Sequence, residues 1–439
     1  MRPDYFQFPL LSALRERRSR RFTLGMEMPD GPLKYKSQSR SAPLSEEEEA
    51  VLTFAACGVT GHALADLCHA PGGGGNIMAG LAARTIASGD GLQAVALIVI
   101  NDGAAWLIRR SREMPQTSIG ELVEKARHGA FLELYRSTRV KIKDGRAAPP
   151  AEPLFNINAN RWSAHAPGTT YFLPVNDLTF MYINGLLEVL NEHTGAFIVD
   201  ERNHFQPAGL GPFARSRGGH LDDDPRRGRV VTIRQVEQFV SEFVTIEQGM
   251  LLQNLALMAE AMGLGGFPNF ANHEFGWFEA LGFRMAEMPA SRYLGAGWLA
   301  ALALKALGRD VVVPYPIGLE RHGENLLTPL CPPYFQSMTE AVQAVVERKF
   351  GAGGVFSAMA GGAWAEPEKV SAQIPRLSSV TIAAAAAYCE YVWRRYGRFP
   401  ATMAPYRTVL GYQVGRIDAD FYDKFYKAGV VTERHRQGF

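Results

Sequence analysis

The sequence has few cysteines and almost no net charge, and both absences exclude classes of protein. The four cysteines in 439 residues are scattered, so they form neither a disulfide framework nor a CxxC metal site. A formal net charge of +2 excludes a chain that binds polyanions over its whole surface. From these absences we expect a cytoplasmic protein that does not bind nucleic acid.

A long apolar run is also missing. The two longest, residues 92–100 and 293–308, are shorter than the roughly 20 residues that a membrane-spanning helix needs, and Lys305 interrupts the second. The N-terminus, MRPDYFQFPLL, lacks the apolar segment and the small-residue cleavage site of a secretory signal. These features predict a chain that does not enter a membrane.

Hydrophobic residues make up 47% of the chain and charged residues 21%, which is enough apolar material for a large core. Residues 44–58, LSEEEEAVLTFAACG, predict a helix that begins with a capping box of Ser45 and Glu48 and stops at Gly58. Residues 232–266 predict a long helix with an apolar repeat, stopped at Gly263. A late helix is expected at 378–397.

Strands are expected where short β-branched runs are bounded by turn residues. Residues 92–102, LQAVALIVIND, and 310–318, DVVVPYPIG, fit this pattern. The glycine-, proline- and charge-rich stretch 206–229 is expected to be a mobile surface loop. Buried strands separated by helices predict an α+β fold.

The segment LRERRSRRF, residues 14–22, places five arginines in seven consecutive positions. Such a run is either a solvated basic face at a helix end or an anion site, because the guanidinium fork matches phosphate oxygens. Nucleic acid would require further basic patches interleaved with aromatic residues. We therefore favour a single phosphate group as the ligand, if one is bound.

Three segments, in order along the chain, resemble the nitroreductase superfamily of FMN flavoproteins, particularly its thiazoline-oxidase (SagB-type) branch. RRSRRF at 17–22, followed by LSEEEEAVLTFAACGVTG, resembles the family's opening R-[RH]-S-x-[RK] motif and first helix. RTIASGDGLQAVALIVIND at 84–102 looks like its A-P-S-x-x-N-x-Q segment and core strand. EQGMLLQNLALMAEAMGLGG at 247–266 is similar to its long central helix.

The resemblance implies a three-layer fold, in which a central mixed or antiparallel sheet is flanked by helices and contains one long central helix. It implies four regions: 1–109 and 231–330 as the two halves of a flavin domain, 110–230 as an insertion or lid, and 331–439 as a C-terminal extension. It further implies a homodimer with FMN at the subunit interface.

Carried over position by position, the resemblance implies roles for eleven residues. The FMN phosphate and ribityl chain would contact Arg17, Arg18 and Ser19, and Arg21 would reach the pyrimidine end of the flavin. Ser88 and Gln93 would approach the ring from the partner subunit, with Arg84 as a further anion contact. The backbone of Gly265, Gly266 and Phe267 would lie beside flavin N5, where glycine allows close approach. Arg321 is the nearest candidate for an added basic residue at the phosphate.

The sequence departs from the family pattern around the ring. Ala87 replaces the usual proline, Gly91 the usual asparagine, and Ala94-Val95 the frequent Pro-Trp pair. The function implied is an FMN-dependent oxidoreductase that transfers hydride at flavin N5 to or from a small organic substrate, aromatic or heterocyclic, with NAD(P)H or O2 as electron partner. No side-chain acid or base is assigned.

Two alternatives remain open at this point. The chain could be a flavin-free nitroreductase-like scaffold or binding subunit of a biosynthetic complex, which the departures at 87, 91 and 94 allow. It could also be a metal-dependent hydrolase built on His193, His204, His220 and Asp222, although these residues contain no HxH, HExxH or HxxxH pair. Several aromatics after Gly265 are core residues or line a substrate pocket: Phe267, Phe270, Phe275, Trp277 and Phe278.

Overall fold

The structure is a computed structural model that describes residues 5–70, 76–110, 113, 118–150, 158–269, 274–358 and 362–437. Phe270, one of the aromatics named above, lies outside these ranges. Among the described residues, no helix combines the length and apolar character that crossing a membrane requires.

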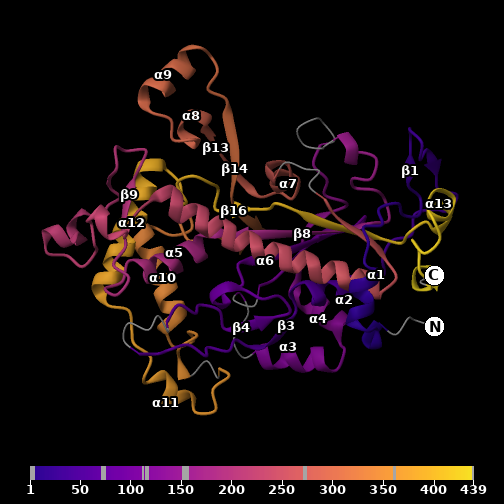
Figure 1. Ribbon diagram of the computed structural model, residues 1–439, viewed down its shortest axis with the longest axis horizontal. Helices are drawn as coiled ribbons and strands as arrows, with labels where there is room; N and C mark the ends of the chain where they lie inside the picture. The colour runs from indigo at the N-terminus through magenta and orange to yellow at the C-terminus, as the bar shows by residue number, and fades with distance from the viewer. Residues whose placement is uncertain are drawn as a thin grey trace.

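A seven-stranded antiparallel sheet is the centre of the fold (Figure 1). Its strands in spatial order are β12 (Gly265–Asn269), β17 (Gly411–Gly415), β8 (Thr170–Asp177), β5 (Val95–Ile100), β6 (Ala104–Ile108) and β7 (Arg139–Asp144), and β16 (Tyr406–Arg407) also pairs with β8. The strand predicted at 92–102 is confirmed as β5. All six of its residues are buried, because each face of the sheet is covered.

Alternate residues of β5 belong to different cores, as the two-residue period of a strand requires. Val95, Leu97 and Val99 pack with helices α2 (Glu46–Cys57) and α6 (Ile233–Ala261). Ile98 and Ile100 face the other way and pack against α7 (Glu274–Ala280) and the strand β14 (Val312–Arg321). The mixed helix and strand content agrees with the predicted α+β class.

The two best-marked helices are confirmed with their caps. Ser45 and Glu48 form a reciprocal capping box at the start of α2. Thr232 begins α6, a helix of 29 residues. Gly263 follows its end with φ +71°, and a Cβ there would lie 2.4 Å from the Arg434 carbonyl oxygen. Glycine is therefore required where the chain leaves α6.

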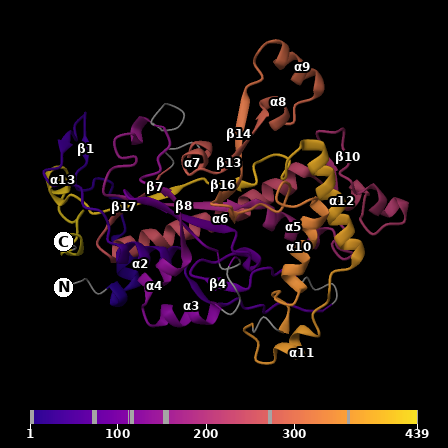
Figure 2. The ribbon, with the colours of Figure 1, turned by 180° about the vertical axis from the view of Figure 1, so that it is seen from behind.

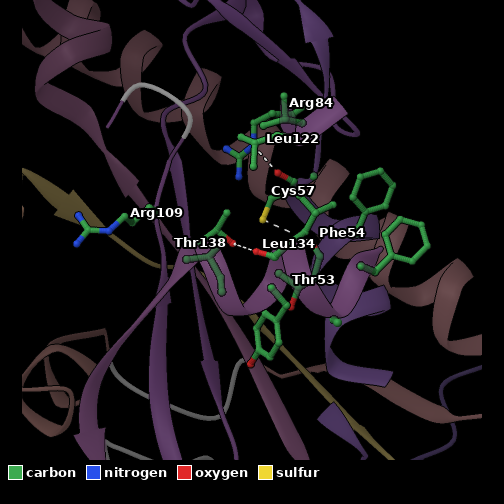
Figure 3. Close-up of a pocket in the computed structure, with 14 residues that line it drawn as sticks. Thr53, Phe54, Cys57, Arg84, Arg109, Leu122, Leu134 and Thr138 are labelled. Atoms are coloured by element: carbon green, nitrogen blue, oxygen red, sulfur yellow. Dashed lines mark hydrogen bonds between the residues drawn. The ribbon is translucent and has the colours of Figure 1, made fainter. Parts of the chain in front are cut away.

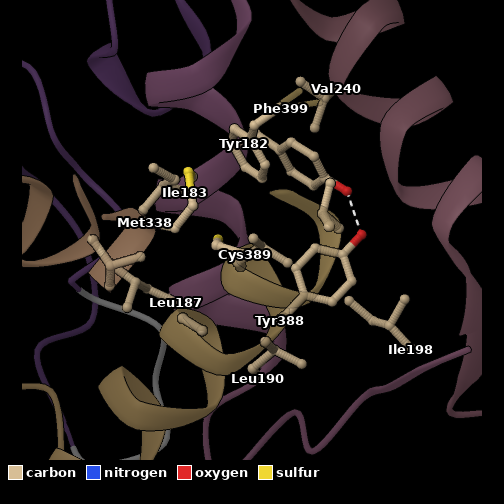
Figure 4. Close-up of a cluster of buried hydrophobic side chains, with 14 of the residues drawn as sticks. Tyr182, Ile183, Leu187, Leu190, Ile198, Val240, Met338, Tyr388, Cys389 and Phe399 are labelled. Carbon is tan, nitrogen blue, oxygen red and sulfur yellow. Dashed lines mark hydrogen bonds between the residues drawn. The ribbon is translucent and has the colours of Figure 1, made fainter. Parts of the chain in front are cut away.

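A second helical layer covers the first half of α6. It contains α5 (Leu178–Val189), α10 (Met338–Phe350) and α12 (Ser379–Tyr396), the last confirming the late helix predicted from the sequence (Figure 2). Figure 4 shows its centre, where the hydroxyl groups of Tyr182 and Tyr388 hydrogen-bond. Tyr182 also donates to the buried Glu237 of α6.

Two regions expected to lie outside the flavin domain contribute to the sheet. Residues 110–230 supply β8, which lies between β17 and β5, and residues 331–439 supply β17. The stretch 206–229 was expected to be a mobile surface loop, but its Leu221 and Asp222 are buried. Asp222 pairs there with Arg215 and Arg227. That part of the stretch is anchored because Leu210, Ala214 and Leu221 pack in the hydrophobic core.

One part of the chain projects from the body as an arm, which we define as residues 284–321. It is a ribbon of β13 (Arg284–Pro289) and β14, tipped by α8 (Ala290–Tyr293) and α9 (Trp298–Ala306), and it extends away from the central sheet in Figures 1 and 2. Tyr293 of α8 contacts Arg398, which follows the end of α12. The strand predicted at 310–318 is confirmed as part of β14. It pairs with β13 and with β15 (Glu324–Leu327), outside the central sheet.

The remaining elements are short helices and small sheets around this frame. The helices are η1 (Tyr5–Gln7), α1 (Leu10–Glu16), η2 (Gly89–Gly91), α3 (Ser118–Arg127), α4 (Phe131–Thr138), η4 (Asn158–Asn160), η5 (Gly211–Phe213), η6 (Arg215–Arg217), η7 (Pro225–Arg227), α11 (Pro367–Ser371), α13 (Ala419–Phe425) and α14 (Glu433–Gln437). The strands are β1 (Glu27–Met28), β2 (Tyr35–Lys36), β3 (Val59–His62), β4 (Ala82–Arg84), β9 (Phe197–Asp200), β10 (Gln206–Pro207) and β11 (Val230–Thr232).

Candidate functional site

The arginine segment passes beside the C-terminal end of α6 and the strand β12. Arg20 donates to the carboxylate of Glu260, one residue before the end of α6, across 2.6 Å. A Cβ on Gly265 would lie 2.8 Å from the Arg20 carbonyl oxygen. Two of the three blocks that carry the resemblance, more than 200 residues apart, therefore meet in one chain.

Arg20 is the buried member of the run and has a structural role. It is 2% exposed, and besides Glu260 it donates to the carbonyl oxygens of Val430 and Glu16. Burial raises the pKa of Glu260, and the charge of Arg20 opposes that shift. Sequence reasoning did not separate Arg20 from its neighbours, because nothing in a run of arginines indicates which one points inward.

Arg21, the next residue, is only partly buried and contacts two aromatic rings. Its guanidinium carbon is 4.6 Å from the centroid of Phe267 and 5.2 Å from that of Trp162. It donates to the side chains of Asn160 and Ser163, and its Nε is buried without a hydrogen-bond partner. Burial lowers the pKa of Arg21 from its ordinary value. The predicted neighbours Arg21 and Phe267 are thus in contact.

Arg17, Arg18 and Ser19 follow the end of α1 and face outward. Arg17 is half-buried, and Arg18 and Ser19 are exposed. The charge of Arg17 acts on Tyr412 of β17, the residue whose ring packs against Gly266. The three side chains predicted to hold a phosphate are therefore accessible at the edge of the Arg21–Phe267 contact.

The structure gives a different reason for the two glycines of β12 than the sequence did. A Cβ on Gly266 would lie 2.6 Å from the Tyr412 ring, and one on Gly265 would lie 2.4 Å from the Ile417 side chain. Packing of Tyr412 and Ile417, near the C-terminus of the chain, therefore requires both glycines. Close approach of a ligand is not needed to explain them.

Ser88, Gln93 and Arg84 form a second group, beside the middle of α6. Ser88 donates to the carboxylate of Glu247, and its oxygen accepts from the Gln93 backbone N–H at 2.9 Å. Arg84 donates to the carbonyl oxygens of Cys57 and Val95, each at 2.9 Å. Burial raises the pKa of Glu247, and Ser88 and Arg84 oppose the shift. Arg84 thus has backbone partners where an anion was expected.

Gln93 has two features of a constrained position. Its φ is +53°, a left-handed conformation that is uncommon for a residue with a side chain. Its side chain is 4% exposed, and its amide oxygen has no hydrogen-bond partner. The loop that carries it is fixed on α6, because a Cβ on Gly89 would overlap the ring of Phe243.

The two groups are well separated within one chain. Ser88 contacts Glu247 of α6, and Arg20 contacts Glu260 of the same helix. Because an α-helix rises about 1.5 Å per residue, the two groups lie roughly 20 Å apart along α6. A single flavin could contact both groups only if one of them came from a second copy of the chain.

Arg321 is not brought to either group. Its Nε and Nη2 donate to the carbonyl oxygens of Ile142 and Leu281. Those residues belong to the core on the face of the sheet opposite α2 and α6. The sequence places Arg321 at the end of the strand expected at 310–318, but it does not indicate which face of the central sheet the side chain reaches.

The histidines considered as metal ligands are dispersed in interactions of other kinds. His220 contacts the carbonyl oxygen of Leu190 at 2.9 Å, and Asp222 is paired with two arginines. His193 and His204 are exposed. Within the described ranges, no three His, Cys, Asp or Glu side chains are grouped as a metal site would require.

One cavity lies elsewhere, between α2, α3 and α4 (Figure 3). It has a volume of about 50 Å³ and is lined mainly by apolar side chains, among them Phe54, Leu122 and Leu134. Of the residues predicted for the site, it includes Arg84. A cavity of this size holds a few waters at most and is too small for a cofactor.

Residues 158–163 are the part of the site that sequence reasoning missed. Asn160, Trp162 and Ser163 contact Arg21, yet they lie in the region expected to be an insertion. No motif distinguishes them, so only the folded chain shows their proximity. Trp277 and Phe278 are core residues on the face of the sheet opposite α2 and α6. This agrees with the expectation that the aromatics after Gly265 belong to the core.

Comparisons with known proteins give little further information. No protein-family model and no curated protein matches this chain. Among solved structures, a presumed nitroreductase from Ralstonia eutropha JMP134 is similar at 12% sequence identity and a TM-score of 0.28, over 63% of this chain and 77% of that one. A TM-score this low does not establish a shared fold.

Proposed function

We propose that the chain is an FMN-dependent oxidoreductase of the thiazoline-oxidase type. The observation that carries the proposal is the contact between the arginine segment and β12, where Arg21 lies over Phe267 although the two are distant in sequence. The resemblance assigns both residues to the surroundings of one flavin, and they come from two of the three blocks that carry it.

The residues present fit a phosphorylated flavin. Arg17, Arg18 and Ser19 would hold the phosphate, because two guanidinium groups and a hydroxyl are accessible within three consecutive positions. Arg21 has a buried Nε without an acceptor, which a carbonyl oxygen or ring nitrogen would satisfy. When bound, FMN supplies hydride transfer at N5.

The chain's own contribution would be binding and electrostatics. Arg21 stays cationic even with its lowered pKa, because the ordinary value of an arginine is far above neutrality. A half-buried cation favours negative charge beside it more strongly than an exposed one, since water screens it less. Phe267 and Trp162 both contact the guanidinium group and help to hold it in place.

A second copy of the chain would complete this site in a homodimer. Ser88 and Gln93 lie too far from Arg21 in one chain to share a ligand with it, and Gln93 keeps an unpartnered amide oxygen. We propose that these two residues approach the flavin of the partner. The electron partner, NAD(P)H or O2, and a small aromatic or heterocyclic substrate belong to the same proposal.

The first test is the absorption spectrum of the purified protein and of the supernatant after heat denaturation. The visible flavin bands, with FMN identified in the supernatant, would support the proposal. Arg17→Ala should then weaken FMN binding by about tenfold or more, since a hydrogen bond to a charged group contributes about 1.5–3 kcal/mol. Arg15→Ala is the matched control, because Arg15 belongs to the same run but is exposed beside Glu16.

One observation favours the second candidate, a flavin-free scaffold. Phe267 is only 4% exposed, and Asn160 and Ser163 already accept hydrogen bonds from Arg21. The Arg21 cluster is therefore largely satisfied without a ligand. A colourless protein that does not take up added FMN would favour this candidate and overturn the first.

A further inference from the structure

The arm exposes an unusual amount of apolar surface. Seven large apolar side chains within residues 294–312 are exposed: Leu294, Trp298, Leu299, Leu302, Leu307, Val311 and Val312. Trp298 alone is 75% exposed. No residue of α9 is buried. The seven side chains lie on α9, on the segments that join it to the ribbon and on Val312, the first residue of β14.

The sequence of α9 does not match that of a solvated helix. WLAALALKA has one charged residue, Lys305, and so it is apolar on every side. A helix that is apolar all round is stable only when other groups cover it. Its nine residues span roughly 14 Å, far less than a bilayer core, and it lacks the charged face of a helix that lies on a membrane.

The area indicates a protein partner. These seven side chains expose on the order of 800 Å² of apolar surface, which equals the share that one partner contributes to a standard interface. Soluble monomers seldom expose a patch of more than roughly 300–600 Å². The arm therefore has enough apolar surface for a stable association.

The same chain carries a second exposed apolar surface, on α6. Phe239, Ile246 and Met250 form a stripe at helical spacing, and they are 59%, 55% and 39% exposed. The exposed Glu242 lies between them in sequence. Around α9, the charged side chains Lys305 and Arg309 are basic and exposed. The arm and the stripe are thus both apolar and carry opposite charges.

Asp310, the acidic residue at the tip of the arm, offsets one of the two basic groups, so Lys305, Arg309 and Asp310 together carry a net charge of +1. Its carboxylate accepts hydrogen bonds from the backbone N–H and the hydroxyl of Ser291. It is therefore engaged within the arm, and the basic groups face outward.

We infer that the arm docks on the α6 stripe of a second copy of this chain, and that the two copies exchange arms around a two-fold axis. A reciprocal exchange buries both surfaces of both copies, so no other partner is needed to cover either one. The inference rests on the exposed surfaces and is independent of whether flavin binds.

The first experiment measures oligomeric state. The wild-type protein should be a dimer by size-exclusion chromatography with light scattering at micromolar concentration. Leu299→Glu/Leu302→Glu should be monomeric, with its circular dichroism spectrum unchanged, because both side chains are exposed in the single chain. Leu64→Glu, on another exposed leucine away from the arm, should remain dimeric. A monomeric wild type, or a dimeric arm variant, would overturn the inference.

The second experiment tests the docking position. In a Cys68→Ser background, which removes the exposed native thiol, Leu302→Cys and Ile246→Cys are made as separate variants and mixed under mild oxidation. A disulfide-linked dimer should form in the mixture and in neither variant alone. Cross-linking of Leu302→Cys with itself would place α9 against α9 and contradict docking on α6. Flavin content is recorded in parallel, so a colourless dimer supports this inference while overturning the proposed function.

Discussion

Arg20 and Arg21 are neighbours in the sequence with different environments and different roles. Arg20 lies inside the molecule against Glu260, and Arg21 lies at the surface of β12 in contact with two rings. The arginines of residues 15–21 therefore do not share one role. One of its members anchors the end of α6, and the others remain available to an anion.

Removing the anchor should destabilise the protein. Arg20→Ala leaves Glu260 buried without its ion pair, and breaking a buried pair in this way costs about 3–5 kcal/mol. Arg18→Ala, an exposed residue of the same run, should change stability by less than about 0.5 kcal/mol. Urea unfolding measures both variants. Equal midpoints would show that the Arg20–Glu260 pair does not stabilise the fold.

His435 should make the protein sensitive to acid. It is fully buried, and burial together with the charges of Arg20 and Arg434 lowers its pKa to about 3. Between pH 6.5 and about 3 the unfolded chain binds a proton at this residue and the folded chain does not. Stability should therefore fall as the pH falls through this range, by about 1.4 kcal/mol per pH unit from this group.

The variant that tests this effect is His435→Gln. It keeps a hydrogen-bonding side chain that can replace the contact of His435 with Thr432 but cannot titrate. Its unfolding free energy should decrease less steeply than that of the wild type between pH 6 and pH 4. An unchanged slope would mean that groups other than His435 account for the acid sensitivity.

At the scale of elements, helices with marked ends were predictable and the positions of strands in the sheet were not. The capping boxes at Ser45 and Thr232 are local signals, and both helices begin where these signals are. Strand β8 was missed, and Pro174 within it is atypical of a central strand. Its position depends on pairing with β5 and β17, which no local pattern specifies.

The same distinction applies to the candidate site. Arg21 and Phe267, both expected at the site from the resemblance, are in contact, and their role in binding a flavin stays a prediction. The side chains of 158–163 carry no motif, and the face of the sheet reached by Arg321 depends on the register of β14. Helix ends could be predicted because their signals are local in the sequence. The position of Arg321 could not, because it depends on how strand β14 pairs with its neighbours.

The end of α6 provides a test at this scale. Gly263→Ala should destabilise the protein by more than about 1 kcal/mol, because φ is +71° and the new Cβ would meet the Arg434 carbonyl oxygen. Gly185→Ala, in the middle of α5 with open space at its Cβ position, should stabilise by about 0.5–1 kcal/mol. Thermal unfolding of the pair checks both signs. An unchanged or raised melting temperature for Gly263→Ala would contradict the helix-end argument.

At the scale of the whole molecule, the separation of the two residue groups allows a complementation experiment. Arg21→Ala and Ser88→Ala should each abolish or strongly reduce FMN binding in their own homodimers. If each site takes Arg21 from one copy and Ser88 from the other, random mixing of subunits restores roughly a quarter of the sites.

Flavin content after co-refolding the two variants measures this recovery. Refolding each variant alone is the control, and it should give little flavin. No recovery from dimers shown to contain both variants would mean that Arg21 and Ser88 do not share a site across the interface.

The position of β17 has a consequence for how the chain is made. This strand, residues 411–415, lies between β12 and β8, so it joins parts of the sheet that precede it by more than a hundred residues. During synthesis from the N-terminus, β12 emerges long before β17, the strand with which it pairs in the described part of the chain. Until the ribosome has released β17, the glycine strand beside Arg21 has an unpaired edge exposed to other nascent chains, which is when aggregation is most easily nucleated.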